Sequence, residues 1–372
     1  MKKSALAIIT AALAMSTAAQ AAEVYNKDGN KLDFYGRVKA MNYISDNTDN
    51  KGKEGDQSYV RIGFKGQTQI NDMLTGYGQW EYQFGANKSE AEGSSGDKTR
   101  LGFAGLKAGD FGSFDYGRNF GLIYDVESIT DMMPEFGATA YTGADVYMLQ
   151  RAGGLATYRN NNFFGLVDNL KFALQYQGKN ESDSRNARYS NGDGMSGSLS
   201  YKFFDTVTAT AAYSSSNRVV AQKNAAYGKG DKADAWATGL KYDANGVYVG
   251  ATYAETRNMN YFSTTMGSID VNGSQQSISG YANKLTNLEL YAHYQFDFGL
   301  RPSIAYVETK AKDLENNVGD GDLYKFVDIG ALYAFNKNMS VFVDYKINLL
   351  DDDNKLRQYA DDTVAVGMTY QF

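Results

Sequence analysis

Few side chains in this sequence could act as a nucleophile, a general base or a metal ligand. The 372 residues include no Cys and a single His, which excludes a disulfide scaffold, a Cys-ligated metal site and catalysis by several histidines. The one histidine, His293, lies on the polar side of an alternating segment, where we interpret it as solvated. We therefore expect neither enzymatic activity nor a cofactor, and no nucleic-acid partner.

Three arginines are informative because each alternates with apolar neighbours. Arg61 lies between Val60 and Ile62, and Arg37 and Arg100 occupy comparable positions in their own segments. Successive side chains of a β-strand point to opposite faces, so each guanidinium would face away from the apolar side. A guanidinium keeps its positive charge at neutral pH, and several of them on one face would give that face a strong positive potential.

The elements that would carry these arginines are β-strands, because apolar and polar residues alternate from end to end. In residues 363–372, apolar and aromatic side chains share one parity and small or polar ones share the other, which is the period of a strand. The chain has 39 Gly, 29 Tyr and 20 Phe but only 2 Pro, and its mean hydropathy is −0.47. Apolar residues are therefore dispersed, whereas a helical membrane protein needs about 20 consecutive ones for each span.

Alternation alone fits a soluble sandwich with its polar face outside or a transmembrane barrel with its polar face inside. Three features favour the barrel: segments of about ten residues suit tilted membrane strands, aromatic residues gather at segment ends, and short connections alternate with long ones. The arginines should then face the lumen, because a guanidinium facing lipid costs about 2–4 kcal/mol at the midplane. The long connections are 46–57, 216–233, 257–283, 312–322 and 349–362.

Sixteen segments alternate in this way, which predicts an all-β fold with a 16-stranded antiparallel transmembrane β-barrel. An even number of strands places both chain ends on the same side, and a barrel of this width keeps an aqueous interior. The predicted strands are 31–45, 57–70, 75–84, 99–107, 113–118, 154–161, 170–177, 194–202, 206–215, 234–243, 247–256, 285–296, 300–311, 324–333, 339–348 and 363–372.

The first 21 residues, MKKSALAIITAALAMSTAAQA, have a charged start, a short apolar run and a small-x-small ending, as in a secretory signal peptide. We predict cleavage after Ala21, which leaves 22–372 as a single barrel domain. Loss of Lys2 and Lys3 then takes the net charge from −6 to −8. With the barrel pattern, this leader predicts a location in the bacterial outer membrane.

Residues 119–153 show no sustained alternation, and Pro134 lies in their middle. A loop of this length is usually either functional or disordered. Its apolar residues, among them Leu122, Ile123 and Phe136, make it too apolar for a solvated tail. Folding into the barrel would bury these side chains, so we predict an inward-folded constriction loop.

Several long blocks of the sequence resemble the enterobacterial general porins of the OmpC, OmpF and PhoE type. The resemblance covers essentially the whole mature chain and implies a homotrimer of 16-stranded barrels in outer-membrane lipid and lipopolysaccharide. In each barrel the third external loop narrows the channel, with a basic cluster on one side and loop carboxylates on the other. The blocks are DGNKLDFYGRV, RIGFKGQTQINDMLTGYGQWEYQF, KTRLGFAGLKAGDFGSFDYGRN, DMMPEFG, ATYRNNNFFGLVDNL, YDANGVYVGATYAETRN, QYQFDFGLRPSIAY and DDTVAVGMTYQF.

The same resemblance implies roles for individual residues. Matched by motif, the basic residues of the constriction are Arg37, Arg61, Arg100 and Arg151, with Lys98 nearby. Its acidic residues are Asp131 and Glu135 of DMMPEFG, and its wall includes Tyr124 and Gly137.

Further implied roles concern assembly. Glu90 in the second external loop is expected to reach the neighbouring subunit, with Arg118 as its partner, and the terminal Phe372 is expected to act as an assembly signal.

Four positions depart from the pattern of the family. Arg37 stands where relatives often have Lys, which keeps the charge but presents a larger planar head. Ala138 and Thr139 replace a common Gly-Asp pair, so one loop carboxylate is absent. Phe120 replaces a common Tyr and loses its hydroxyl.

Together these features predict a general diffusion porin, a water-filled channel for ions and small hydrophilic solutes with a transverse field at its constriction. The net charge and the acidic outer loops favour a weak cation preference. A sugar-specific channel and an exported soluble β-rich binding protein are the alternatives. A divalent cation held near Asn348, Leu350 and Asp361 is a further hypothesis, set against a solvated acidic loop. The outer loops could also serve phage or toxins as receptors.

Overall fold

The computed structural model describes residues 22–45, 54–92, 96–138, 146–182 and 184–372. The predicted leader, 1–21, lies outside the described residues, and so does Thr139. The longest helix described has four residues, and no helix in the described part of the chain is long and apolar enough to cross a membrane.

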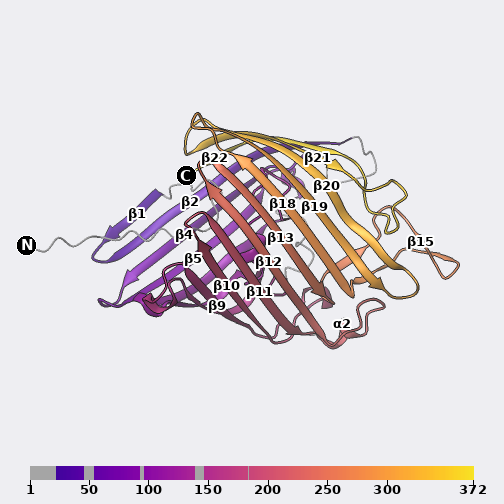
Figure 1. Ribbon diagram of the computed structural model, residues 1–372, viewed down its shortest axis with the longest axis horizontal. Helices are drawn as coiled ribbons and strands as arrows, with labels where there is room; N and C mark the ends of the chain where they lie inside the picture. Colours follow the sequence, from indigo (N-terminus) through magenta and orange to yellow (C-terminus); the bar gives the residue numbers. More distant parts are fainter. Residues whose placement is uncertain (1–21, 46–53, 93–95, 139–145, 183) are drawn as a thin grey trace, which may run out of the picture.

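Sixteen antiparallel strands form one closed barrel, which confirms the predicted fold (Figure 1). Each strand pairs with its neighbours in the chain, and pairing of β2 with β22 closes the ring. The barrel strands are β2 (Asn30–Ile44), β4 (Tyr59–Gln69), β5 (Leu74–Gly85), β6 (Lys98–Ala108), β7 (Ser113–Phe120), β8 (Arg151–Asn160), β9 (Leu170–Gln177), β10 (Gly194–Phe203), β11 (Val207–Asn217), β12 (Lys232–Ala244), β13 (Val247–Arg257), β18 (Lys284–Tyr294), β19 (Leu300–Leu314), β20 (Gly319–Ala334), β21 (Met339–Asn348) and β22 (Thr363–Gln371).

The two faces of each strand follow the alternation of the sequence. In β22, Val366, Met368 and Tyr370 are exposed on the outer face, whereas Thr369 and Gln371 are buried on the inner face. Exposed aromatic pairs at strand ends, such as Tyr294 with Phe296 and Tyr333 with Phe335, have ring centroids 4.7 and 5.1 Å apart. Apolar surface therefore faces outward, as a lipid environment requires.

Strands β1 and β22 both contribute to the seam of the barrel. Strand β1 (Ala22–Lys27) pairs with the first part of β2, where Ala22 lies opposite Phe34. Strand β22 pairs with the second part of β2, from Arg37 onward. Between them, the backbone of Phe372 exchanges two hydrogen bonds of 3.0 Å with Gly36. The predicted assembly signal, Phe372, thus lies at the point where the barrel closes.

One predicted loop is wrong. Residues 312–322 are largely strand, because β19 continues to Leu314 and β20 begins at Gly319, with two register shifts in the pairing. The extension packs against the outer loops: Leu314 and Leu323 belong to a buried apolar cluster with Leu356 of the 349–362 connection. The polar sequence of this segment did not predict a hairpin, because the hairpin is stabilised by packing against a loop that is distant in the sequence.

Other differences are smaller. The strand predicted from residue 154 begins at Arg151, and the strand predicted to end at residue 118 continues to Phe120. The connection 257–283 contains two short hairpins, formed by β14 (Tyr261–Ser263) with β17 (Ser279–Tyr281) and by β15 (Ile269–Val271) with β16 (Ser274–Gln276). Strand β15 and helix α2 (Val220–Lys223) lie at the end of the barrel away from β1 (Figure 1).

The connection between β7 and β8, residues 121–150, is named here the constriction loop. It includes helix α1 (Tyr124–Glu127). Its side chains Leu122, Ile123 and Val126 are fully buried, and Met132, Met133 and Phe136 pack into the main apolar cluster with residues of the barrel wall. The constriction loop supplies seven of the 21 buried residues of this cluster, and most of the others lie on the barrel strands.

Candidate pore constriction

Neighbouring strands place arginines beside each other on the inner face of the barrel. Strand register sets Arg37 opposite Arg61, and Arg61 opposite Gln83 of β5. The amide oxygen of Gln83 accepts hydrogen bonds from the Arg61 Nη2 at 2.8 Å and from the Arg100 Nη1 at 3.2 Å. A neutral amide therefore holds two like-charged groups at a fixed separation.

Glu81 also lies among these arginines. Its Oε1 accepts from the Arg100 Nε at 3.0 Å and lies 3.7 Å from the Arg61 Nε, while its Oε2 accepts from the Tyr35 hydroxyl at 3.1 Å. An irregularity in the pairing of β5 with β6 follows Glu81 and falls at Arg100. Sequence analysis missed Glu81 and Gln83. Both alternate with outward-facing residues of their strand, so the same alternation that identified the arginines could have identified them.

Arg151 extends this group from the other side of the constriction loop. It is the first residue of β8, and its guanidinium carbon lies 5.3 Å from the centroid of the Phe120 ring. Arg100 and Arg151 interact electrostatically, as do Arg61 and Arg37. We call Arg37, Arg61, Arg100 and Arg151 the basic wall. Lys98, at the start of β6, is exposed and lies opposite Gln83 in register.

The carboxylate of Asp131 faces the basic wall. It accepts a hydrogen bond of 2.7 Å from the Tyr124 hydroxyl. Burial raises the pKa of the Asp131 carboxyl, while the Tyr124 hydroxyl and the charges of Arg151 and Arg100 act in the opposite direction. Gly137 lies so close that a side-chain carbon there would collide with the Asp131 Oδ1. The four predicted groups Tyr124, Asp131, Gly137 and Arg151 are thus brought together.

Glu135 has different partners. Its Oε2 forms an ion pair with the Lys39 ammonium, and its Oε1 accepts from the Tyr43 hydroxyl at 2.5 Å. The backbone N–H groups of Glu135 and Phe136 donate to the Asp344 Oδ2 at 2.7 and 3.2 Å. We call Pro134, Glu135 and Phe136 the loop tip. Sequence analysis did not single out Lys39, Tyr43 or Asp344.

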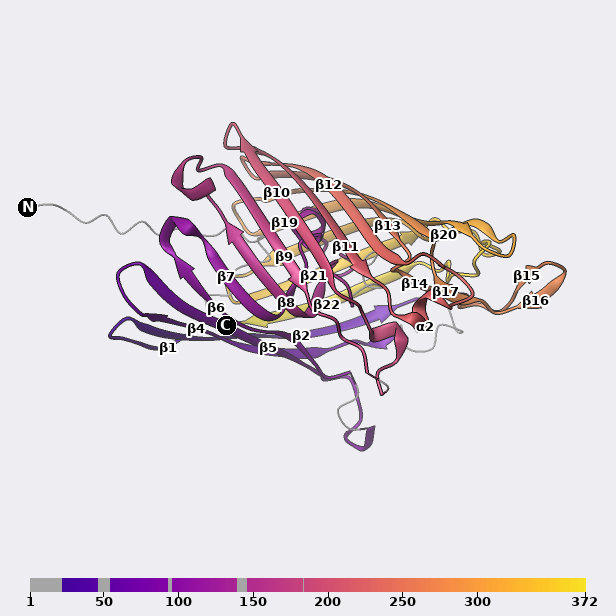
Figure 2. The same cartoon turned by 90° about the horizontal axis from the view of Figure 1, so that it is seen from below.

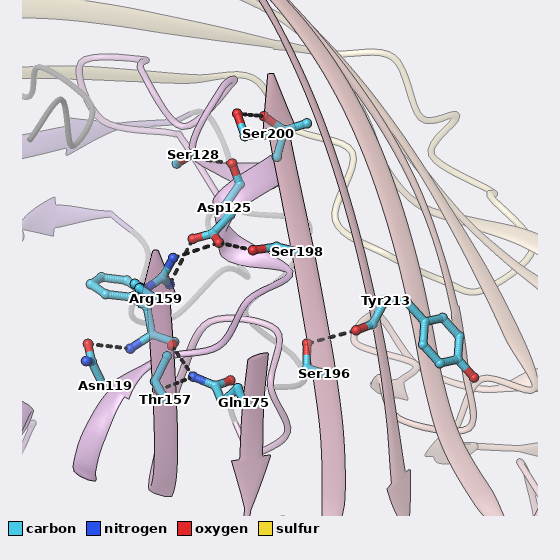
Figure 3. Close-up of polar contacts among 12 residues, drawn as sticks. Asn119, Asp125, Ser128, Thr157, Arg159, Gln175, Ser196, Ser198, Ser200 and Tyr213 are labelled. Atoms are coloured by element: carbon cyan, nitrogen blue, oxygen red, sulfur yellow. Dashed lines mark hydrogen bonds and ion pairs between the residues drawn. The ribbon is translucent and has the colours of Figure 1, made fainter. Parts of the chain in front are cut away.

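The loop is also held where it leaves β7. Asp125 of α1 forms a bidentate ion pair with Arg159 of β8, with N–O distances of 2.9 and 3.0 Å, and accepts from Ser198 of β10 at 2.6 Å (Figure 3). Further along, the Tyr248 hydroxyl donates to the Ile129 carbonyl at 2.8 Å. These contacts fix the constriction loop across the lumen.

The barrel, the basic wall and the loop carboxylates can be compared with known proteins. The family model described as Gram-negative porin matches residues 27–372. The chain belongs to the Gram-negative porin family. This porin is 62% identical over 383 residues to outer membrane protein Omp-EA of Erwinia amylovora, and 56% identical over 373 residues to outer membrane porin PhoE of Escherichia coli strain K12; each comparison covers 100% of both chains.

A solved structure supports the same conclusion. The Salmonella typhi OmpF complex with daunomycin is 48% identical to this porin with a TM-score of 0.83, covering 94% of this chain and 100% of that one. The protein is therefore an outer-membrane general diffusion porin, a passive channel for small hydrophilic solutes. Its family and relatives are channel proteins.

The two residues predicted to join neighbouring subunits, Glu90 and Arg118, lie on the outer parts of the porin. Glu90 is exposed and begins the short 3-10 helix η1 (Glu90–Glu92). This helix belongs to the connection between β5 and β6, which projects away from the barrel (Figure 2). Arg118 of β7 donates from its Nε to the Thr99 carbonyl at 3.0 Å.

The residues named for the hypothetical cation site lie where the connection 349–362 begins and ends. The Asn348 amide nitrogen donates to the carbonyls of Tyr359 and Asp361 at 3.0 and 3.3 Å, and its oxygen accepts from the Leu350 N–H at 3.1 Å. The amide thus bonds to protein groups that close the loop. Within the described residues, no group of three or more His, Cys, Asp or Glu side chains is placed to hold a metal ion.

Proposed function

We propose that the constriction sorts solutes by an electric field directed across the channel, from the basic wall to the carboxylate of Asp131. The observation that carries this proposal is the placement of Asp131 on an inserted loop within electrostatic reach of Arg100 and Arg151. Low-dielectric protein around a narrow aqueous passage focuses such a field. Its direction is across the path of the solute, so the field orients solutes without driving them along the channel.

Such a field favours small polar solutes. A solute with a dipole aligns with the field and passes, whereas a large or apolar solute must shed water without an equivalent interaction. The net charge of the mature chain and acidic residues of the outer loops, among them Asp351 and Asp352, favour a weak preference for cations over anions.

Liposome swelling tests this function directly. Graded sugars should enter at rates that fall with size and do not saturate; saturable entry would instead indicate a substrate-specific channel. Arg100→Ala should raise the entry rate of bulky zwitterionic solutes, because it removes one charge and one large side chain from the basic wall. Lys241→Ala is the matched control, since this lumen-facing lysine contacts the Tyr248 ring outside the basic wall. Equal rates for the Arg100 variant and the parent protein would contradict the proposal.

We also infer that the porin is a homotrimer in outer-membrane lipid and lipopolysaccharide. The outer face near β1 carries a shallow groove whose lining includes Leu32, Gly66, Gly76 and Gly78, where small residues allow a neighbour to approach closely. Glu90 lies in the projecting connection that could reach such a neighbour. Mass measurement in detergent should give three chains, and Glu90→Ala should lower the temperature at which the trimer dissociates.

A further inference from the structure

Lys39 is the least expected charged group of the constriction. It lies on β2 two residues after Arg37 and on the same inner face, yet its side chain is only 9% exposed. Its ammonium forms an ion pair with Glu135, donates to the Pro134 carbonyl at 2.9 Å and lies 4.3 Å from the centroid of the Phe342 ring. Every one of these contacts holds the loop tip or the wall beside it.

Both oxygens of the Glu135 carboxylate have bonding partners. Lys39 occupies Oε2 and the Tyr43 hydroxyl occupies Oε1, and the side chain is only 14% exposed. The adjoining backbone is fixed as well, because Asp344 accepts from two consecutive N–H groups of the loop tip. Rotation of Glu135 toward the basic wall would break the ion pair and the Tyr43 hydrogen bond together.

Two opposite unit charges in contact act on a passing ion almost as a neutral pair, because their potentials cancel at distances larger than their separation. Glu135 therefore contributes little net negative charge to the channel while Lys39 is present. Asp131, by contrast, accepts its hydrogen bond from a neutral group, the Tyr124 hydroxyl. The two carboxylates of DMMPEFG are chemically alike but electrostatically unequal.

We propose that Lys39 determines the ion selectivity of the channel by neutralising Glu135 at the loop tip. The inference rests on the proposed function, in which charges at the constriction sort ions. Asp131 is then the loop carboxylate that opposes the basic wall. Lys39 makes the cation preference weaker than two uncompensated carboxylates would produce. Lys39 is a positioning and selectivity residue, since it acts on ions through Glu135.

The test is the reversal potential of the refolded full-length channel in a planar bilayer under a potassium chloride gradient. Lys39→Gln should raise the ratio of cation to anion permeability by about threefold, as expected for one unit of charge several ångströms from the ion path. Glu135→Gln should lower the ratio by a similar factor, because it leaves the Lys39 charge uncompensated. The double variant should return close to the parent ratio, and Lys39→Arg should keep that ratio.

A purely structural role for Lys39 gives a different pattern. If Lys39→Gln changes the conductance but leaves the reversal potential unchanged, or if both single variants shift it in the same direction, the inference is overturned. Folding of each variant is checked by its heat-dependent gel migration. If Lys39→Gln does not fold, Glu135→Gln alone decides, since an unchanged ratio there also overturns the inference.

Arg100→Ala in the same bilayer separates this inference from the proposed function. A shift of the reversal potential with Arg100→Ala but none with Lys39→Gln refutes only the role of Lys39. No shift with either variant refutes the proposed field itself, and the role of Lys39 falls with it.

Discussion

The arginines of the basic wall and the carboxylates of the constriction loop reach the same lumen by different means. Arg37, Arg61 and Arg100 are placed by the register of regular strands, whose backbone hydrogen bonds run the length of the barrel. The described residues of the constriction loop, 121–138 and 146–150, form no such ladder with the wall that the loop faces, and a few side chains hold them there. A change to the wall should therefore leave the fold and its stability nearly unaltered, whereas a change to a loop anchor should alter geometry and stability as well.

The largest effect is expected at the loop tip. Asp344→Ala removes the acceptor of two backbone N–H groups, and each buried group without a partner costs about 1–3 kcal/mol. We expect the free energy of unfolding, measured by guanidinium titration in lipid vesicles, to fall by about 2 kcal/mol. Single-channel conductance should also rise as the tip leaves the wall.

Asp344→Asn is the matched control, because it removes the charge but keeps one oxygen as acceptor. Its stability should lie between those of the parent protein and the alanine variant. Equal stability of the alanine variant and the parent would show that the tip does not depend on Asp344.

A smaller effect is expected at the base of the loop. Asp125→Ala removes the bidentate pair with Arg159, whose two side chains are 26–32% exposed, so solvent screening reduces the loss to about 1 kcal/mol. The same guanidinium titration measures it, and Asp125→Asn, which keeps one acceptor, should lose less. A conductance change as large as that of Asp344→Ala would contradict the distinction between base and tip.

The smallest effect is expected beside the basic wall, at an amide that bonds to two of its arginines. Gln83→Leu removes the acceptor shared by Arg61 and Arg100 but leaves their strands paired. We expect stability to stay within about 0.5 kcal/mol of the parent, because both arginines keep Glu81 and lumen water as partners. Conductance in a planar bilayer should change modestly. A stability loss comparable to that of Asp344→Ala would contradict placement of the wall by register alone.

The same difference explains how far sequence could predict the structure. Parity located Arg37, Arg61 and Arg100 on the inner face because a strand has a fixed period. Lys39 had the same parity, but its role depends on where the loop tip meets the wall, and no local pattern encodes that contact. The hairpin at 312–322 was missed for a related reason, since Leu314 and Leu323 are buried by Leu356 of a separate loop.

The seam of the barrel has a consequence for chain connectivity. Along the edge of β2, Phe372 lies opposite Gly36 and Ala22 lies opposite Phe34. Strands β22 and β1 both run antiparallel to β2, so they point in the same direction along its edge. The end of β22 and the start of β1 are separated by one residue position, the one opposite Tyr35. Once the leader is removed as predicted, a single inserted residue is long enough to join Phe372 to Ala22, since a strand residue extends about 3.4 Å. The fold is thus nearly circular, and a permuted chain opened at another short turn would retain the pairing of all sixteen strands.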